Sequence, residues 1–286
     1  MSDGWLTMYK IEESMAFKRQ LARDLEYRSP AKRHALRFGF LDWVRAISFH
    51  ARILWVYAVA RKMIRKGHFD MEAYANRSWK SLHVAESSGG RVEVTGLTHL
   101  AGTSGPVVII GNHMGSLETI VLPALILPFK DVAFVVKESL RTHFVFGPIM
   151  QSVKHIAVGR SNPREDLKLV LTRGEELIRQ GVSVVIFPQA TRAAEFDIEG
   201  FNTLGVKLAA RAGVPLIPLA LKTDFMANGT WVKDMGYVHP ERTIHFAFGA
   251  PLKVAASGRE EHAAVVKFVA AHLKEWGGTI KGEVPL

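Results

Sequence analysis

The chain has 286 residues, of which 48% are hydrophobic and 22% charged, and its formal net charge is +10. This length suffices to bury the core of one large domain, alone or with a smaller one. The chain contains no cysteine, which excludes disulfides, thiolate nucleophiles and zinc–thiolate sites. The basic balance indicates an anionic partner: nucleic acid, an anionic membrane or phosphorylated substrates.

The first 90 residues are predicted to be helical and to contain no strand. Residues 1–80 carry 16 Lys and Arg against 8 Asp and Glu, so most of the net charge lies here. The most regular segment spans residues 36–66, where apolar side chains recur at spacings of three and four: Phe40, Trp43, Val44, Ile47, Ala51, Leu54, Trp55 and Ala58. Such a basic, tryptophan-containing helix either packs on the protein or lies in a membrane interface.

No uninterrupted apolar stretch approaches the roughly 20 residues that a helix needs to cross a bilayer. The N-terminus also lacks the apolar core of a secretory signal. We therefore expect an N-terminal membrane-associating segment that lies on an anionic membrane, at the cytoplasmic face, as a peripheral protein.

Beyond residue 91 the sequence pattern becomes that of an α/β protein. Apolar, Val- and Ile-rich runs predict strands at 92–95, 107–111, 133–136, 155–158, 183–187, 215–221 and 243–248. Helices are predicted at about 117–127, 139–151, 163–180, 200–212 and 258–276. This alternation favours an α/β fold with a mainly parallel central sheet flanked by helices. The Ser-Ser-Gly-Gly run at 87–90 marks the boundary between predicted domains 1–90 and 91–286.

Reactive side chains in open α/β sheets collect beyond the carboxyl ends of strands. His113 and Glu118 follow the strand at 107–111, and five residues would separate them by about 140° on one continuous helix. They meet only if His113 lies in the turn and Glu118 in the first helical turn, with Ser116 as N-cap. Glu118 would then fix the imidazole tautomer, and the other ring nitrogen would act as a general base.

Three cations also follow predicted strands, namely Lys137, Arg160 and Arg192. Each alone is more often a solvated surface charge. In a parallel sheet the three would converge beside His113, and converging Lys and Arg donors bind phosphate well.

The ordered motifs resemble those of the 1-acyl-glycerol-3-phosphate acyltransferase (lysophospholipid acyltransferase) family. They are Asn-His-x4-Glu at 112–118, Phe-Val-x-Lys-x-x-Leu at 134–140, a strand ending in Arg160, Phe-Pro-x-x-Thr-Arg at 187–192 and the Val-Pro-rich segment 214–220. The resemblance covers about residues 107–221. It departs where the family usually has His-x4-Asp and Phe-Pro-Glu-Gly-Thr-Arg, because this chain has Glu118, Gln189 and Ala190. These differences bear on the acceptor more than on the reaction.

The resemblance implies a role for each matched position. His113 would be the general base and Glu118 its partner. Lys137, Arg160, Gln189, Thr191 and Arg192 would bind a lysophosphatidic acid-like acceptor, and segment 214–220 would form the floor of the site. The acyl donor would be acyl-CoA or acyl carrier protein, with no metal, no other cofactor and no acyl-enzyme intermediate.

Backbone N–H groups near the start of the helix at 117–127 are expected to stabilise the oxyanion. Residues 120–129 are more typical of core than of an acyl-chain path. Two alternatives stay open: a non-catalytic lipid- or membrane-binding protein on this fold, and an acyltransferase for another lipid acceptor. Nucleic-acid binding is not expected, because the basic residues alternate with apolar residues at helical spacing.

Overall fold

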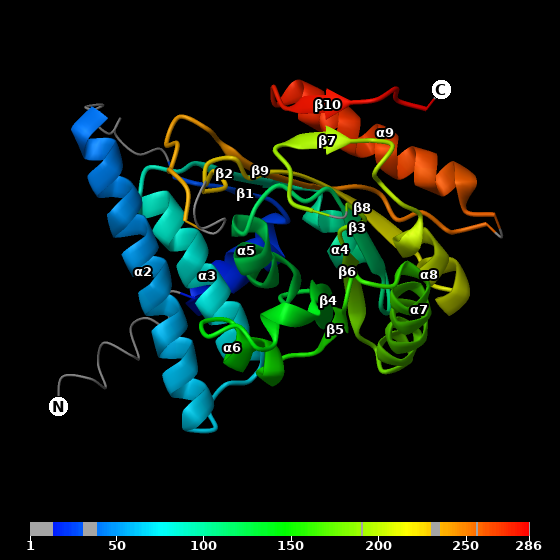
Figure 1. Cartoon of the computed structure of the whole chain (residues 1–286), viewed down its shortest axis with the longest axis horizontal. Coiled ribbons are helices and arrows are strands. Elements are labelled where there is room, and N and C mark those ends of the chain that lie inside the picture. The colour runs from blue at the N-terminus through cyan, green and yellow to red at the C-terminus, as the bar shows by residue number, and fades with distance from the viewer. Residues whose placement is uncertain (1–13, 31–38, 190, 230–234, 256, 286) are drawn as a thin grey trace.

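A computed structural model describes residues 14–30, 39–189, 191–229, 235–255 and 257–285 of the chain. In this part of the chain an eight-stranded sheet forms the centre (Figure 1). Its spatial order is β1 (Tyr27–Arg28), β2 (Val92–Thr95), β9 (Ile244–Phe248), β8 (Leu216–Lys222), β3 (Val108–Gly111), β6 (Ser183–Ile186), β4 (Val132–Lys137) and β5 (His155–Val158).

The five strands from β8 to β5 run parallel to one another. β9 is antiparallel to β8 and parallel to β2, and β1 is antiparallel to β2. Every residue of β3, β6 and β8 is buried, which explains why these strands are continuous apolar runs without alternation. The predicted mainly parallel sheet is therefore confirmed.

Helices flank the sheet in two groups (Figure 1). One group consists of α2 (Gly39–Arg65) and α3 (Met71–Ser87), at the left of the view, together with α5 (Leu117–Ile126) and α6 (Gly147–Ser152). To the right lie α7 (Pro163–Arg179), α8 (Leu204–Ala212) and α9 (Arg259–Glu275). Smaller elements are α4 (Leu97–Gly102), the 3₁₀ turn η1 (Glu138–Leu140), and a parallel pair formed by β7 (Glu195–Asp197) and β10 (Thr279–Lys281). Residues 14–24 are also helical.

Local sequence signals explain where several helices begin and end. Asp70 precedes α3 and accepts a hydrogen bond from the N–H of Ala73 at 2.8 Å. Asn162 caps α7 in the same way, and Pro163 occupies its first turn, where a missing N–H costs nothing. Gly213, at φ 66°, ends α8 in the left-handed conformation that favours glycine.

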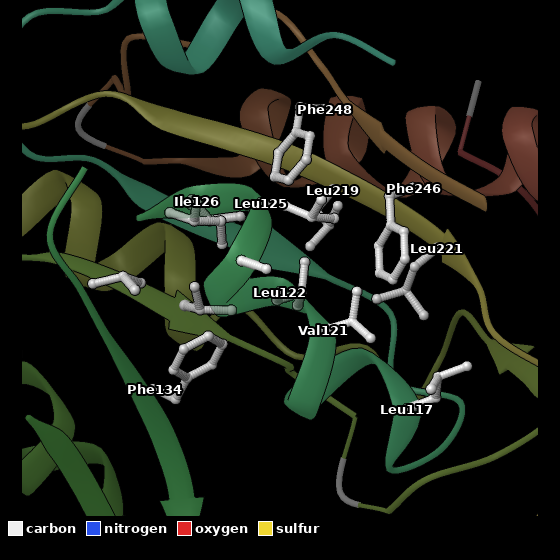
Figure 2. Close-up of a cluster of buried hydrophobic side chains, with 14 of the residues drawn as sticks. Leu117, Val121, Leu122, Leu125, Ile126, Phe134, Leu219, Leu221, Phe246 and Phe248 are labelled. Atoms are coloured by element: carbon white, nitrogen blue, oxygen red, sulfur yellow. The ribbon is translucent and has the colours of Figure 1, made fainter. Parts of the chain in front are cut away.

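The hydrophobic face of α5 covers the sheet (Figure 2). Val121, Leu122, Leu125 and Ile126 lie among apolar side chains of β4, β8 and β9, and are at most 2% exposed. Most of the segment 120–129 is therefore core, as its composition favours.

Two predictions about local structure are wrong. The first 90 residues do contain a strand, because Tyr27 and Arg28 pair with Val94 and Glu93; two residues are too few to show an alternating pattern. The predicted helix 139–151 is in fact η1, a turn, and then α6. Pro148 explains the break, because inside a continuous helix it would lack the N–H that bonds the carbonyl of residue 144 and its ring would clash with that carbonyl. It is accommodated in the first turn of α6, where a missing N–H costs nothing.

The N-terminal helices share the hydrophobic core of the sheet region. α3 packs between α2 and α5, and Phe49 of α2 contacts Phe225 edge-to-face, with 5.8 Å between ring centroids. The predicted boundary near residue 90 thus separates a mainly helical region from a region of alternating strands and helices, while a single hydrophobic core continues across it.

α2 carries two apolar faces. One face, which includes Ala46, Phe49, Ile53, Val56 and Ala60, is buried. Most of the apolar residues that recur in the sequence form a second, exposed face, which we call the exposed stripe: Trp43, Val44, Ile47, Leu54 and Trp55. Within the described residues no helix is long and apolar enough to span a bilayer.

The two faces of α2 predict opposite responses to truncation. Phe49 is fully buried, whereas Trp55 is 70% exposed. Phe49→Ala should lower the free energy of unfolding by about 3–5 kcal/mol, and the matched control Trp55→Ala should change it by about 0.5 kcal/mol or less. Urea denaturation followed by circular dichroism measures both. Equal losses in the two variants would contradict this assignment of the faces.

Candidate active site

The carboxyl ends of five parallel strands meet at one edge of the sheet. β3 leads into His113, β4 ends at Lys137, β5 leads into Arg160, β6 leads to Arg192, and β8 is followed by Thr223. This edge is where open α/β sheets place reactive groups.

His113 and Glu118 are in direct contact. His113 lies in the turn after β3, and Glu118 lies in the first turn of α5. The distance from Nδ1 of the imidazole to Oε1 of the carboxylate is 2.9 Å. With a proton on Nδ1, the ring donates to Glu118 and its Nε2 becomes the proton acceptor. No described residue hydrogen-bonds to Nε2.

The Glu118 carboxylate also organises the surrounding loop. Its Oε1 accepts hydrogen bonds from the N–H groups of Met114 and Gly115, each at 2.7 Å, and its Oε2 accepts one from the hydroxyl of Thr223 at 2.6 Å. Burial alone would raise the pKa of Glu118, but the hydrogen bonds from His113, Thr223 and Gly115 outweigh burial and lower it. The carboxyl is therefore held as a buried carboxylate.

At the start of α5 one expectation is wrong, and a second holds for fewer N–H groups than expected. Ser116 occupies the N-cap position but its side chain does not cap the helix; instead its hydroxyl accepts a hydrogen bond from Arg192. The N–H groups of Met114 and Gly115 donate to Glu118, and that of His113 donates to Gln189. These three groups are therefore committed within the protein. That other N–H groups at the start of α5 stabilise the oxyanion stays a prediction.

The loop after β6 holds His113 on several sides. The ring of Phe187 stacks on the imidazole, with centroids 4.6 Å apart and planes 11° apart. The Oε1 of Gln189 accepts from the His113 N–H at 2.7 Å, and the Ala193 N–H donates to the His113 carbonyl at 3.1 Å. Gln189 is buried and is absent from the cavity wall. The structure thus gives this predicted acceptor-binding residue a supporting position under His113.

His113 opens onto a cavity of about 390 Å³ between the strand ends and helices α2, α3, α5 and α6. The wall includes Lys137, Arg160, Thr191 and Arg192, so the structure brings the three predicted cations together with His113. None of the described residues that line this cavity is Asp or Glu. The cavity therefore presents positive charge beside an apolar interior.

Arg160 is held in an unusual backbone conformation. Its φ is 62°, a left-handed geometry that costs a side-chain-bearing residue about 1–2 kcal/mol. The Asp166 carboxylate on α7 holds this turn, because it accepts from the N–H groups of Gly159 at 3.0 Å and Arg160 at 2.8 Å. Burial of part of the side chain and repulsion from Arg192 lower the pKa of Arg160, while Asp166 opposes the shift.

The sequence did not predict the roles of some residues of the site. Asn112 belongs to the motif at 112–118 but had no role predicted for it; it exchanges two hydrogen bonds with the backbone of Leu221, at 2.8 and 2.9 Å. Asn228 donates to the Met114 carbonyl at 3.0 Å. Thr223 follows a buried strand directly, so the strand-end rule would have found it. Asn228 lies in an irregular segment that offers no such signal.

No three His, Asp or Glu side chains within the described ranges come together as ligands for a metal ion. That the reaction needs no metal and no other cofactor stays a prediction.

The acyltransferase family model matches residues 91–222, the segment that contains β2 to β8, His113 and the three strand-end cations. Beyond this match, the chain is similar to proteins named 1-acyl-sn-glycerol-3-phosphate acyltransferase. The enzyme of that name from Pseudomonas aeruginosa is 32% identical over 172 residues, which cover 60% of this chain and 63% of the relative. One from Chlamydomonas reinhardtii is 31% identical over 131 residues, or 46% of this chain and 38% of the relative.

A solved structure shares the fold. The crystal structure of the 1-acyl-sn-glycerophosphate (LPA) acyltransferase PlsC from Thermotoga maritima matches with a TM-score of 0.60 and 15% identity, covering 82% of this chain and 96% of that one. The chain spans less than two thirds of the length of the curated relatives above.

Substitution of Gln189 tests whether its hydrogen bond with the His113 N–H stabilises the protein. Gln189→Ala should leave the buried His113 N–H without its acceptor and lower the free energy of unfolding by about 1–3 kcal/mol. Gln189→Glu keeps an acceptor oxygen and should lose less. Thermal and urea denaturation measure the change, with Gln151→Ala at an exposed position of α6 as control. Equal stability of the Gln189→Ala protein and the wild type would contradict this role.

Proposed function

We propose that this chain is an O-acyltransferase that moves a fatty acyl group from a thioester donor to the hydroxyl of a lysophosphatidic acid-like acceptor. The observation that carries the proposal is the His113–Glu118 contact, with His113 on the wall of a cavity whose described lining includes three strand-end cations and no carboxylate. This arrangement pairs a base that can activate a hydroxyl with donors for a phosphate group.

The reaction follows from the orientation of the imidazole. Nε2 of His113 accepts the proton of the acceptor hydroxyl as its oxygen attacks the thioester carbonyl. Collapse of the tetrahedral intermediate breaks the carbon–sulfur bond, and the leaving thiolate takes the proton from Nε2. Glu118 stabilises the imidazolium between these steps, because its carboxylate is buried 2.9 Å from Nδ1. The oxyanion requires donors other than the N–H groups of residues 113–115.

The strand-end cations orient the acceptor. Lys137, Arg160 and Arg192 bind its phosphate, and Arg can do so with two parallel hydrogen bonds. Arg160 and Arg192 lie close enough for their charges to interact. This mutual repulsion is relieved when a dianionic phosphate binds between them, so the pair favours an acceptor with a phosphate over a neutral alcohol. Thr191 lines the same wall.

The apolar part of the cavity receives acyl chain. Its wall includes Tyr57 of α2 and Phe146 beside α6, which meet edge-to-face with centroids 4.9 Å apart. The donor is acyl-CoA or acyl carrier protein, and no metal or other cofactor takes part.

The exposed stripe of α2 is proposed to lie in the interface of an anionic membrane, which makes the protein peripheral to the cytoplasmic face. The stripe continues onto neighbouring segments. His50 bonds to the Gly236 carbonyl at 2.7 Å, which places the exposed Met235 and Tyr237 beside α2. At the other end, Arg61 lies 4.7 Å from the ring centroid of Phe144, which is 80% exposed.

Basic residues support this orientation. Lys62, Arg65 and Lys66 lie at the C-terminal end of α2 and in the turn after it, where they are placed to contact anionic headgroups. Apolar side chains in the acyl boundary and cations at the headgroups are typical of interfacial helices. The same helix lines the cavity through Tyr57, so lipid substrates would enter from the membrane beside it.

His113→Ala should lower acyl transfer by about 10²–10⁴-fold, the range of general-base catalysis, while the protein stays folded. The assay incubates purified protein with radiolabelled acyl-CoA or acyl carrier protein and a panel of lysophospholipids. His99→Ala, in α4 and away from the cavity wall, is the matched control. Turnover in the wild type that survives His113→Ala would remove this mechanism. Binding of lipid without any turnover in the wild type would favour a non-catalytic lipid-binding protein.

The double variant Ile47→Asp, Trp55→Asp should reduce co-sedimentation with vesicles of phosphatidylglycerol and phosphatidylcholine by more than about tenfold, because each change puts a carboxylate where the acyl boundary would lie. Leu169→Asp, an equally polar change at an exposed position of α7, is the control. Undiminished binding of the double variant would contradict the role of the stripe, and salt-dependent DNA binding without vesicle binding would favour nucleic acid instead.

A further inference from the structure

One charged side chain in the cavity comes from outside the segment that matches the family model. Arg77 lies on α3 and lines the cavity together with the strand-end cations. It is partly buried, and burial lowers the pKa of its guanidinium. No Asp or Glu among the described residues pairs with it. Among the same described residues its Nη2 donates only to Asn76, and its Nε is shielded from solvent without a hydrogen-bond partner.

The face of α3 around Arg77 is polar where a plain acyl-chain tunnel would be apolar. Tyr74, Ser78 and Ser81 also line the cavity, and with Arg77 they occupy positions i, i+3, i+4 and i+7, which share one side of a helix. The hydroxyls of Tyr74 and Ser78 have no hydrogen-bond partner among the described residues. Burial raises the pKa of Tyr74, so its phenol stays neutral and able to donate.

A guanidinium in this position needs an anion. Removing a charge from water is costly unless a partner compensates, and the protein supplies no carboxylate on this wall. Lys137 and Arg160 are exposed, so water competes for their ligands. Arg77 is less solvated, and a charge-assisted hydrogen bond there is stronger for the same geometry.

We propose that Arg77, with the hydroxyls of Tyr74 and Ser78, forms an oxyanion-binding subsite on α3 that takes an anionic oxygen group of the lipid substrate, a phosphate or a carboxylate. The inference rests on the proposed function for its substrate class. It makes α3 a wall of the site, so that the N-terminal helices contribute a ligand-binding residue as well as a membrane-facing surface.

Direct binding to the purified full chain tests the subsite. The soluble probes are octyl phosphate, octanoate and octanol, with dissociation constants from calorimetry. Arg77→Met should weaken binding of octyl phosphate, octanoate or both by about 10- to 100-fold and leave octanol within about twofold. Lys80→Met removes the same charge from the same helix, but Lys80 is not on the cavity wall and lies over Trp79; it should change none of the three.

The pattern of loss identifies the oxyanion. A loss confined to octyl phosphate assigns Arg77 to the acceptor phosphate, and a loss confined to octanoate assigns it to a fatty-acid carboxylate. Equal loss for octanol would show a collapsed cavity, and unchanged binding of both anions, or no binding to the wild type, would overturn the proposal. Arg77→Lys keeps the charge and should retain most of the affinity, even if the methionine variant fails to fold. These measurements need no turnover. If the protein showed no acyltransferase activity but bound the anions through Arg77, the proposed reaction would be contradicted and the subsite would stand.

Discussion

The site depends on one buried carboxylate. Glu118 is fully shielded from solvent, and four groups compensate its charge: the His113 ring, two backbone N–H groups and the hydroxyl of Thr223. A buried charge is tolerated only when it is satisfied in this way. The same bonds set the path of the loop after β3, fix the imidazole orientation and tie β3 to the end of β8. The extra methylene of glutamate, compared with the usual aspartate of the family, is accommodated, since the side chain reaches His113 and Thr223 at once.

Around this carboxylate, the sheet positions the reactive side chains and the helices line the cavity. The parallel strands place His113 and the cations at one edge of the sheet. In the loop after β6, Phe187 stacks on the imidazole and Gln189 accepts a hydrogen bond from the His113 N–H. The helices α2, α3 and α6 also line the cavity and supply part of its apolar wall. α2 can do this and still present the exposed stripe, because it is apolar on two faces. A helix with a single apolar face could bury that face either in the core or in a membrane interface, but not in both.

Part of this organisation was readable from the sequence, and particular residues show why the rest was not. The motif residues His113, Lys137, Arg160 and Arg192 follow predicted strands, and those strands are present within a residue or two of their expected ends. Gln189 was matched to a substrate-binding position by its motif, but its side chain turns under His113, which only the packing of the loop decides. Arg77 carries no signal at all, since a lone arginine on an amphipathic helix reads as a surface charge. The recurring apolar residues of α2 were visible, but whether that face is buried depends on what α3 leaves uncovered.

The sequence by itself determined the class of fold, the edge of the sheet where the reactive groups gather and the pairing of an imidazole with a carboxylate. Periodicity, strand ends and turn residues are local properties, and these features follow from them. Only the tertiary structure decided which face of α2 is exposed, which N–H groups Glu118 consumes, that Gln189 supports His113, and that a guanidinium from α3 enters the cavity. Each of these depends on contacts between segments far apart in the chain, and residue spacing within one segment carries no information about them.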